Sequence, residues 1–290
     1  MNCPIILNFD RSVGEINNAK TIDVTEWQDA IRFGCTEKKF FHFEKVLQQS
    51  LPEKYGTVLM GSGDFHHVSL LLIERLAKQY SASNPIQVVV FDNHPDNMRY
   101  LFGIHCGSWI SYVANLPFVS HVHVLGITSQ DIGLFHFWEN RWSPLFHKKL
   151  TYWSLDVNVA WAKKIGLSHA FRDFATPADL IASFLSEQYH STQPIYLSID
   201  KDVLSEEVVH TNWDQGKLQT YHILDTITSI KSRLIGSDIT GELSIWRSSN
   251  WFKRFLSSLD KQPMISSDDL SNWQQEQHQL NLTLLKALSG

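Results

Sequence analysis

The chain has 290 residues, of which 43% are hydrophobic, 19% charged and 12% aromatic, so it can bury a sizeable core and is not mainly disordered. Lysine and arginine total 25 against 30 aspartate and glutamate residues, and the net charge of -5 provides no basic field for binding a nucleic acid or an anionic membrane. We therefore expect a small polar substrate or a protein partner.

Two further features of the sequence predict a soluble, cytoplasmic protein. The N-terminal segment lacks the basic start and the long apolar stretch of a secretory signal, and no apolar run approaches the roughly 20 residues needed to cross a bilayer. The three cysteines, Cys3, Cys35 and Cys106, are too few and too scattered for a disulfide framework or a cysteine zinc site, which indicates a reducing compartment.

Short apolar runs along the chain predict strands that are buried on both faces. Each run is continuous rather than alternating, which is typical of a parallel sheet covered on both sides. The predicted strands are Ile5–Phe9, Thr57–Met60, Ile86–Phe91, Val119–Leu125, Leu150–Leu155, Ile195–Ile199 and Leu234–Ile239.

Amphipathic stretches with helix start signals separate these strands. Asp23 and Glu26 predict a capping box, and Thr176 and Pro177 open another helix. The alternation predicts one α/β domain over residues 1–290 with a mainly parallel sheet, whose functional groups gather at the C-terminal ends of the strands. Helices are predicted over Trp27–Phe33, His67–Gln79, Thr176–Phe184 and Tyr221–Ser232, and a loop over Ser266–Gln279 leads into a C-terminal helix.

The segment after the predicted strand Ile86–Phe91 carries two acids and a histidine at alternate positions. In extended geometry Asp92, His94 and Asp96 point to one side and place three ligand groups in a small volume. Two carboxylates and an imidazole suit a divalent ion such as Mn, Fe or Zn. The alternative is a turn in which Asp92 caps the backbone and His94 is exposed.

A second strand ends in the same way. Asp200 and Asp202 follow the predicted strand Ile195–Ile199, again two residues apart. Two adjacent carboxylates repel each other unless a cation or a proton lies between them. A metal ion would supply the missing charge, and the alternative is a pair of solvated loop acids near Lys201 or Lys217.

Three histidines and a glutamate complete the candidate site. The glycine-rich segment Met60–Asp64 lies between a strand and a helix, so that His66 or His67 could add a nitrogen ligand at the same edge of the sheet. His105 follows the first acidic motif and could move protons near neutral pH, or be a structural histidine. Glu242, after the last predicted strand, could hold a cationic substrate or form a salt bridge to an arginine such as Arg247.

In this order the motifs resemble those of the ureohydrolases, the group of arginase, agmatinase and formiminoglutamase. That family shows a Gly-Gly-Asp-His element, then Asp-Ala-His-x-Asp, then Ser-x-Asp-x-Asp, and finally an acid after a late strand. The resemblance covers most of the chain, from about Thr57 to Glu242. The matching segments are Gly61–His66, Asp92–Asp96, Ser198–Asp202 and Asp238–Glu242.

The resemblance implies a three-layer α/β/α domain with a parallel sheet and a binuclear metal centre. The family holds two Mn2+ ions bridged by a hydroxide, and Fe2+ or Zn2+ would also suit these ligands. By position, the resemblance assigns two ligands that bridge both ions (Asp92 and Asp200), two that complete one site (His66 and Asp96) and two that complete the other (His94 and Asp202).

The resemblance also implies a reaction. The hydroxide would attack an sp² carbon and cleave a C–N bond of a guanidino or amide-like small molecule. Asp96 would accept the hydroxide proton, His105 resembles the proton-shuttling histidine of the family, and Glu242 resembles the acid that holds the guanidinium.

The departures from the family pattern concern the substrate more than the metals. Phe65 is inserted before His66, and Gly241 is inserted before Glu242. Asp214 lies where the family has a glycine-rich loop and could contact the substrate. Segments at about 1–50 and 250–290 have no family counterpart, so arginine itself is not predicted as the substrate.

Two other functions fit the same residues. A deacetylase-like amidohydrolase would hold a single zinc ion through Asp92, His94 and another aspartate, although the pair Asp200 and Asp202 favours two ions. A noncatalytic metal-binding protein could use tryptophans as an interaction surface, among them Trp138, Trp142, Trp153, Trp161, Trp246 and Trp251. A homo-oligomer is compatible with all three functions.

Overall fold

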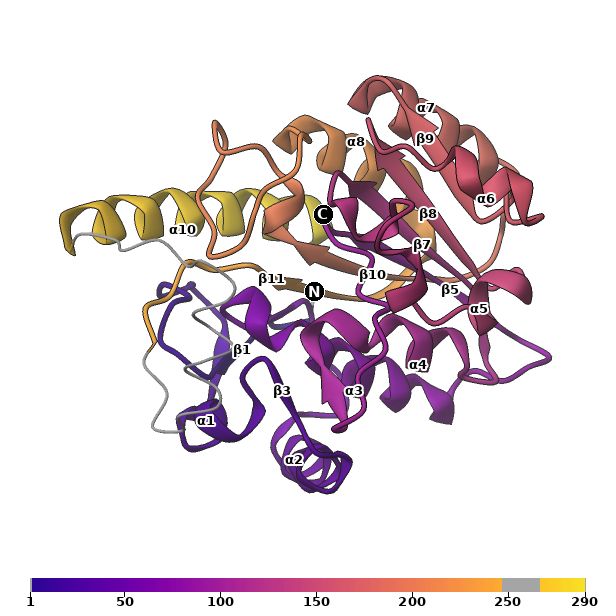
Figure 1. The fold of residues 1–290 in the computed structure, drawn as a ribbon. Coiled ribbons are helices and arrows are strands. Elements are labelled where there is room, and N and C mark those ends of the chain that lie inside the picture. The colour runs from indigo at the N-terminus through magenta and orange to yellow at the C-terminus, as the bar shows by residue number, and fades with distance from the viewer. Residues whose placement is uncertain (1, 247–266, 290) are drawn as a thin grey trace.

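Nine strands form one parallel sheet in a computed structural model of the chain, which describes residues 2–246 and 267–289 (Figure 1). Every neighbouring pair in this sheet runs parallel. From edge to edge, the strands are β2 (Lys20–Asp23), β1 (Ile5–Asn8), β4 (Val58–Leu59), β11 (Leu234–Thr240), β10 (Ile195–Asp200), β5 (Ile86–Phe91), β7 (Val119–Ile127), β8 (Leu150–Leu155) and β9 (Phe171–Phe174).

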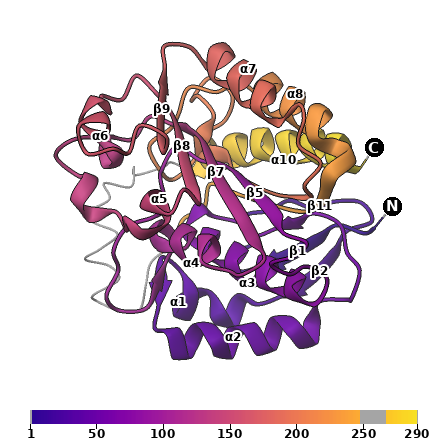
Figure 2. The same cartoon turned by 90° about the vertical axis from the view of Figure 1, so that its right-hand side faces the viewer.

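Helices cover both faces of this sheet (Figures 1 and 2). One face carries α2 (Glu37–Ser50), α3 (Ser69–Glu74) and α4 (Ile110–Ala114), and the other carries α7 (Pro177–Gln188), α8 (Thr220–Ile230) and α10 (Ser267–Ser289). The predicted three-layer α/β/α fold is confirmed. Shorter helices α1 (Gln28–Ile31), α5 (Ser143–Phe146) and α6 (Ala160–Lys164) and the antiparallel pair β3 (Gly34–Cys35) and β6 (Ile104–His105) complete the described fold.

Strand β5 explains why the strand sequences are continuous apolar runs. Val88 and Val90 pack into the core on one side of the sheet, whereas Val89 and Phe91 pack into the core on the other side. Because side chains alternate between the two faces of a strand, a strand covered on both faces must be apolar at every position. All seven predicted strands are present: two have the predicted ends, and the ends of the others differ by at most two residues.

The helix predictions were less accurate. Asp23 does not cap a long helix: its carboxylate accepts bonds from the backbone and hydroxyl of Thr25, and α1 has only four residues. The predicted helix over His67–Gln79 is reduced to α3, with 3-10 turns on both sides. The sequence analysis did not predict α2, whose buried stripe consists only of Phe40, Phe43 and Leu47.

The prediction of a loop over residues 266–279 was wrong where the structure describes it. Helix α10 begins at Ser267 and continues to Ser289. Its inward face includes the amide of Gln277, which is fully buried and donates to the backbone oxygen of Gly241 (3.0 Å). A polar side chain on the buried face removed the apolar periodicity that would have predicted the helix.

The tryptophans do not form one recognition surface in the described part of the chain. Trp153 and Trp161 lie in the core, whereas Trp138 is 59% exposed. Trp251 lies outside the described residues. Among the helices that the structure describes, none is both long enough and apolar enough to cross a bilayer.

Candidate metal centre

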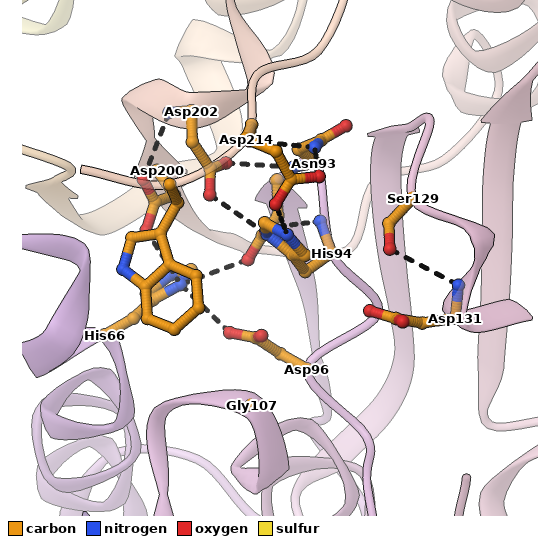
Figure 3. A network of polar contacts seen from close by, with 12 residues as sticks. His66, Asn93, His94, Asp96, Gly107, Ser129, Asp131, Asp200, Asp202 and Asp214 are labelled. Carbon is orange, nitrogen blue, oxygen red and sulfur yellow. Dashed lines mark hydrogen bonds and ion pairs between the residues drawn. The ribbon is translucent and has the colours of Figure 1, made fainter. Parts of the chain in front are cut away.

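The predicted ligands follow two neighbouring strands and one short helical turn. β5 leads into residues 92–96, and β10 ends at Asp200; because the two strands are paired in parallel, their C-terminal ends lie side by side. A 3-10 turn over Gly63–Val68, just after β4, carries His66. Figure 3 shows side chains from these segments converging on one small region.

Three carboxylates surround one ring nitrogen of His66. Its Nδ1 lies 3.1 Å from Asp92 Oδ2, 3.1 Å from Asp96 Oδ2 and 3.4 Å from Asp200 Oδ2. Within the described chain, His66 Nδ1 and Asp92 Oδ2 are buried and take part in no hydrogen bond of good geometry. Buried lone pairs that face one another in this way are an arrangement that a bound cation would stabilise.

A hydrogen-bond chain fixes the orientation of the His66 ring. The Ser198 hydroxyl donates to Asp238 Oδ1 (2.7 Å), so its oxygen is free to accept from His66 Nε2 (2.9 Å). With the proton on Nε2, the lone pair of Nδ1 faces the three carboxylates. Metal-binding histidines have their second nitrogen fixed in this manner.

His94 and Asp202 form a second group that shares Asp92 with the first. His94 Nδ1 lies 3.0 Å from Asp202 Oδ2 and 3.6 Å from Asp92 Oδ1. The other ring nitrogen, Nε2, lies 2.9 Å from Asp214 Oδ1. In each of the two groups, His66–Asp92–Asp96 and Asp92–His94–Asp202, one ligand atom from every residue lies within 4.8 Å of the others.

Four buried carboxylates, those of Asp92, Asp96, Asp200 and Asp202, lie close together with two histidines. Burial lowers the pKa of His66, but its contacts with Asp92 and Asp96 raise it well above the ordinary value, so two imidazolium groups face four acids. Burial raises the pKa of Asp200 well above its ordinary value, and the carboxylate of Asp202 raises it further. Lys201, between them in sequence, directs its ammonium to Glu242 instead (2.6 Å). Among the described ion pairs, only the two histidines meet these aspartates. Divalent cations would supply the missing charge.

Asp96 reaches the first group through an unusual backbone conformation. Its φ angle is 44°, in the left-handed region that few non-glycine residues adopt, so the segment is not extended throughout as predicted. The indole of Trp109 donates to Asp96 Oδ2 (2.7 Å) and holds the carboxylate beside His66. The alternate spacing therefore brought the three residues to one site, but Asp96 and His94 belong to different ligand groups.

A cavity of about 310 Å³ opens onto both groups. Asp92, His94, Asp96, Asp200 and Asp202 form its floor, and His105 lies in its wall. The remaining wall consists mainly of apolar and acidic residues, among them Phe33, Met98, Tyr100, Asp131, Glu139 and Trp213. The site can therefore accept a small molecule directly above the candidate metal ligands.

The structure places only one of the two adjacent histidines, His66 and His67, beside the candidate ligands. His66 faces the carboxylates, whereas His67 is buried on the other side of the turn and stacks on Phe40, with ring centroids 5.6 Å apart. Ser198 and Trp109, which orient His66 and Asp96, were given no role from the sequence, although Ser198 opens the Ser-x-Asp-x-Asp element. Ser198 lies two residues before Asp200 on the same strand, a spacing that could have indicated it.

We expect Ser198→Ala to weaken metal binding by about 10- to 100-fold, because His66 loses the acceptor that fixes its ring. The metal affinity is measured by competition with a fluorescent chelator. Ser154→Ala, which removes an equally buried strand hydroxyl in β8, is the matched control. Equal affinities in both variants would show that the Ser198 contact does not orient a ligand.

Comparison with known proteins places this site in a family. The model of the arginase family matches residues 7–241 of the chain. The chain therefore belongs to the arginase family. It is 25% identical over 223 residues to an uncharacterized protein of Thermotoga maritima, an alignment that covers 76% of this chain and 71% of that protein.

Solved structures of arginase-family enzymes share the fold of this chain. Proclavaminate amidino hydrolase of Streptomyces clavuligerus gives a TM-score of 0.55 at 13% identity and covers 99% of this chain and 93% of its own. A formiminoglutamase variant of Trypanosoma cruzi, solved with Mn2+, gives 0.51 at 13% identity and covers 90% and 94%. At such low identity these likenesses concern the fold alone.

This arginase-family member does not present Glu242 to the cavity. The carboxylate is 2% exposed, pairs with Lys201 Nζ at 2.6 Å and accepts from the Asn281 amide at 2.7 Å. The structure thus corrects the predicted contact with a guanidinium, because the carboxylate is already neutralised below the site. The predicted alternative of a salt bridge holds with Lys201 as the partner, and Arg247 lies outside the described residues.

Of the two other predicted site residues, His105 lines the cavity and Asp214 does not. The carboxylate of Asp214 contacts His94 Nε2 and the side-chain amide of Asn93, which gives it an orienting position, and its contact with the substrate stays a prediction. His105 lies in the wall, and its Nδ1 accepts from the backbone of Gly107 (3.0 Å). Its proposed proton transfer would therefore use the other ring nitrogen.

Proposed function

We propose that this arginase-family chain is a binuclear-metal-dependent hydrolase that cleaves a C–N bond in a guanidino or amide-like small molecule. The observation that carries the proposal is the pair of buried ligand groups that share Asp92. Each group combines one imidazole nitrogen with carboxylate oxygens, and Asp200 lies beside the first. Such a donor set suits Mn2+, and also Fe2+ or Zn2+.

The residues divide into shared and individual ligands. Asp92 would contact both ions, because it contacts both histidines, and Asp200, which lies beside His66, is proposed as the second shared ligand. His66 and Asp96 would complete one site, and His94 and Asp202 the other. Two adjacent divalent ions supply Lewis-acid activation of water at neutral pH.

The protein's own residues would prepare the site for this chemistry. Trp109 holds Asp96, which lines the cavity and would accept a proton from the attacking water. Asp214 fixes the ring of His94 and Ser198 fixes that of His66, so that neither ligand must reorganise when metal binds. His105, in the cavity wall, would return a proton to the leaving amine.

The presence of two ligand groups favours two ions over the alternative of a single zinc ion. A one-zinc site built from Asp92, His94 and Asp202 would leave Asp96 and Asp200 as buried acids that, among the described ion pairs, have only His66 as a cationic partner. Such a cluster is costly, because neighbouring buried carboxylates repel each other.

A metal count followed by a substrate screen tests the proposal. The purified chain, supplemented with Mn2+, is expected to retain about two ions per chain after dialysis. Release of urea, ammonia or amine is then measured across guanidino compounds and acylated amines. One ion per chain would favour the single-zinc alternative, and two ions without turnover of any compound would favour a noncatalytic metal-binding protein.

A further inference from the structure

Exposed apolar side chains gather on two loops next to the cavity. In one loop Leu101 is 90% exposed and Phe102 68%, and in the other Phe135 is 83% exposed. Soluble proteins rarely expose so many large apolar side chains together without a binding role. We call this surface the apolar rim, and it consists of Met98, Leu101, Phe102, Leu134, Phe135 and Trp138.

Backbone contacts join the two loops where they reach the cavity wall. Met98 forms an isolated antiparallel bridge with Asn140, and the Arg99 amide donates to the Glu139 oxygen (2.7 Å). Met98 belongs both to the rim and to the cavity wall. Tyr100, also in the wall, contacts the ring of Phe102 with centroids 5.8 Å apart. The rim therefore continues the cavity wall outwards into solvent.

The charge of the cavity wall restricts what can occupy it. Asp131 and Glu139 lie in the wall, and among the described residues no lysine or arginine does. In Figure 3 the carboxylate of Asp131 points towards the side of the cluster that holds Asp96. In the wall itself, a distal carboxylate such as that of an amino acid would meet acids and no cation; Arg99, on the adjoining loop, directs its Nε to the backbone oxygen of Asn140. A cationic head with an apolar tail would meet matching surfaces at both ends.

We propose that the substrate is a guanidino compound whose amine side is an apolar chain without a carboxylate, and that the apolar rim binds this chain. The inference rests on the proposed function of the same site. Water would add its oxygen to the guanidinium carbon, the bond from this carbon to the substituted nitrogen would break, and that nitrogen would take a proton. One alkylguanidinium and one water thereby give one urea and one alkylammonium.

Binding of alkylguanidines tests the rim independently of turnover. Kd values for methyl-, butyl-, hexyl- and octylguanidine are measured by calorimetry on the Mn2+-loaded chain. Each methylene that reaches the rim is expected to tighten binding by about two- to fourfold. Hexylguanidine is expected to bind at least about tenfold tighter than 6-guanidinohexanoate, which adds only a carboxylate. Equal affinities across the series, or tighter binding of the acid, would overturn the proposal.

Substitutions in the apolar rim test whether the rim binds the alkyl chain. Phe102→Ser and Phe135→Ser are expected to bring the affinity ratio of octylguanidine to methylguanidine towards one, whereas Tyr189→Ser, an equally exposed aromatic on α7's C-terminal side, should leave the ratio unchanged. An unchanged ratio in the rim variants, with loss of a dimer in sedimentation, would overturn the proposal and identify the rim as an interface between copies. Chain-length-dependent binding without urea release would support the rim and contradict the proposed function.

Discussion

Asp92→Asn and Asp200→Asn are expected to remove both metal ions. Asp92 contacts both histidines of the candidate centre, whereas Asp200 lies 3.4 Å from His66 and accepts from the Asp202 backbone, so we expect the loss of either carboxylate to affect both sites. We expect the metal content to fall from about two ions per chain to well below one, and any hydrolytic activity to fall at least about 100-fold. Elemental analysis of the dialysed variants and a urea assay measure the two effects.

The stability of the same variants separates loss of metal from loss of fold. In the metal-free state, Asp200→Asn replaces a carboxyl whose charged form is disfavoured by burial and by the neighbouring Asp202, so its melting temperature should equal or exceed that of the metal-free parent. Asp173→Asn, which changes an acid of β9, is the control and should retain metal. Full metal content in Asp92→Asn or Asp200→Asn would contradict the ligand assignment.

Lys201→Met is expected to give the largest loss of stability. Lys201 is fully buried, and its ammonium lies 2.6 Å from Glu242 and donates to Asn281 (3.1 Å) and to Gln277. Removing the cation leaves Glu242 as an uncompensated buried charge. Breaking such a pair costs about 3–5 kcal/mol of unfolding free energy, which urea denaturation measures.

A double variant tests whether the loss of stability arises from the ion pair between Lys201 and Glu242. Adding Glu242→Gln to Lys201→Met removes the stranded charge and keeps an acceptor for Asn281, so more than half of the lost free energy should return. If Lys201→Met costs less than about 1 kcal/mol, or if the second substitution restores nothing, the pair does not stabilise the end of β10.

The central part of the fold was predictable because one physical cause determines the strand sequences. Strands such as β5 and β10 are covered on both faces, which requires an apolar side chain at every position. The edge strand β2 and helix α2 were not predicted. Their outer faces are solvated, so β2 buries only Ile22 and α2 presents a narrow apolar stripe.

The candidate ligands were predictable for a related reason. Acids that directly follow buried strands of a parallel sheet must lie at one edge, so Asp92 and Asp200 could be placed together without a structure. The contacts that orient Asp96 and His94 could not be predicted, because Trp109 and Asp214 reach the site from loops whose path depends on tertiary packing. The predicted contact of Glu242 with a guanidinium was wrong for the same reason, because the sequence does not reveal that Lys201 pairs with this carboxylate beneath the site.

The most direct test of the binuclear centre is anomalous X-ray scattering from crystals grown with Mn2+. We predict two anomalous peaks per chain, one bounded by His66, Asp92 and Asp96 and the other by Asp92, His94 and Asp202, with Asp200 contacting both. A single peak at either position, or peaks only at other places in the chain, would contradict the account.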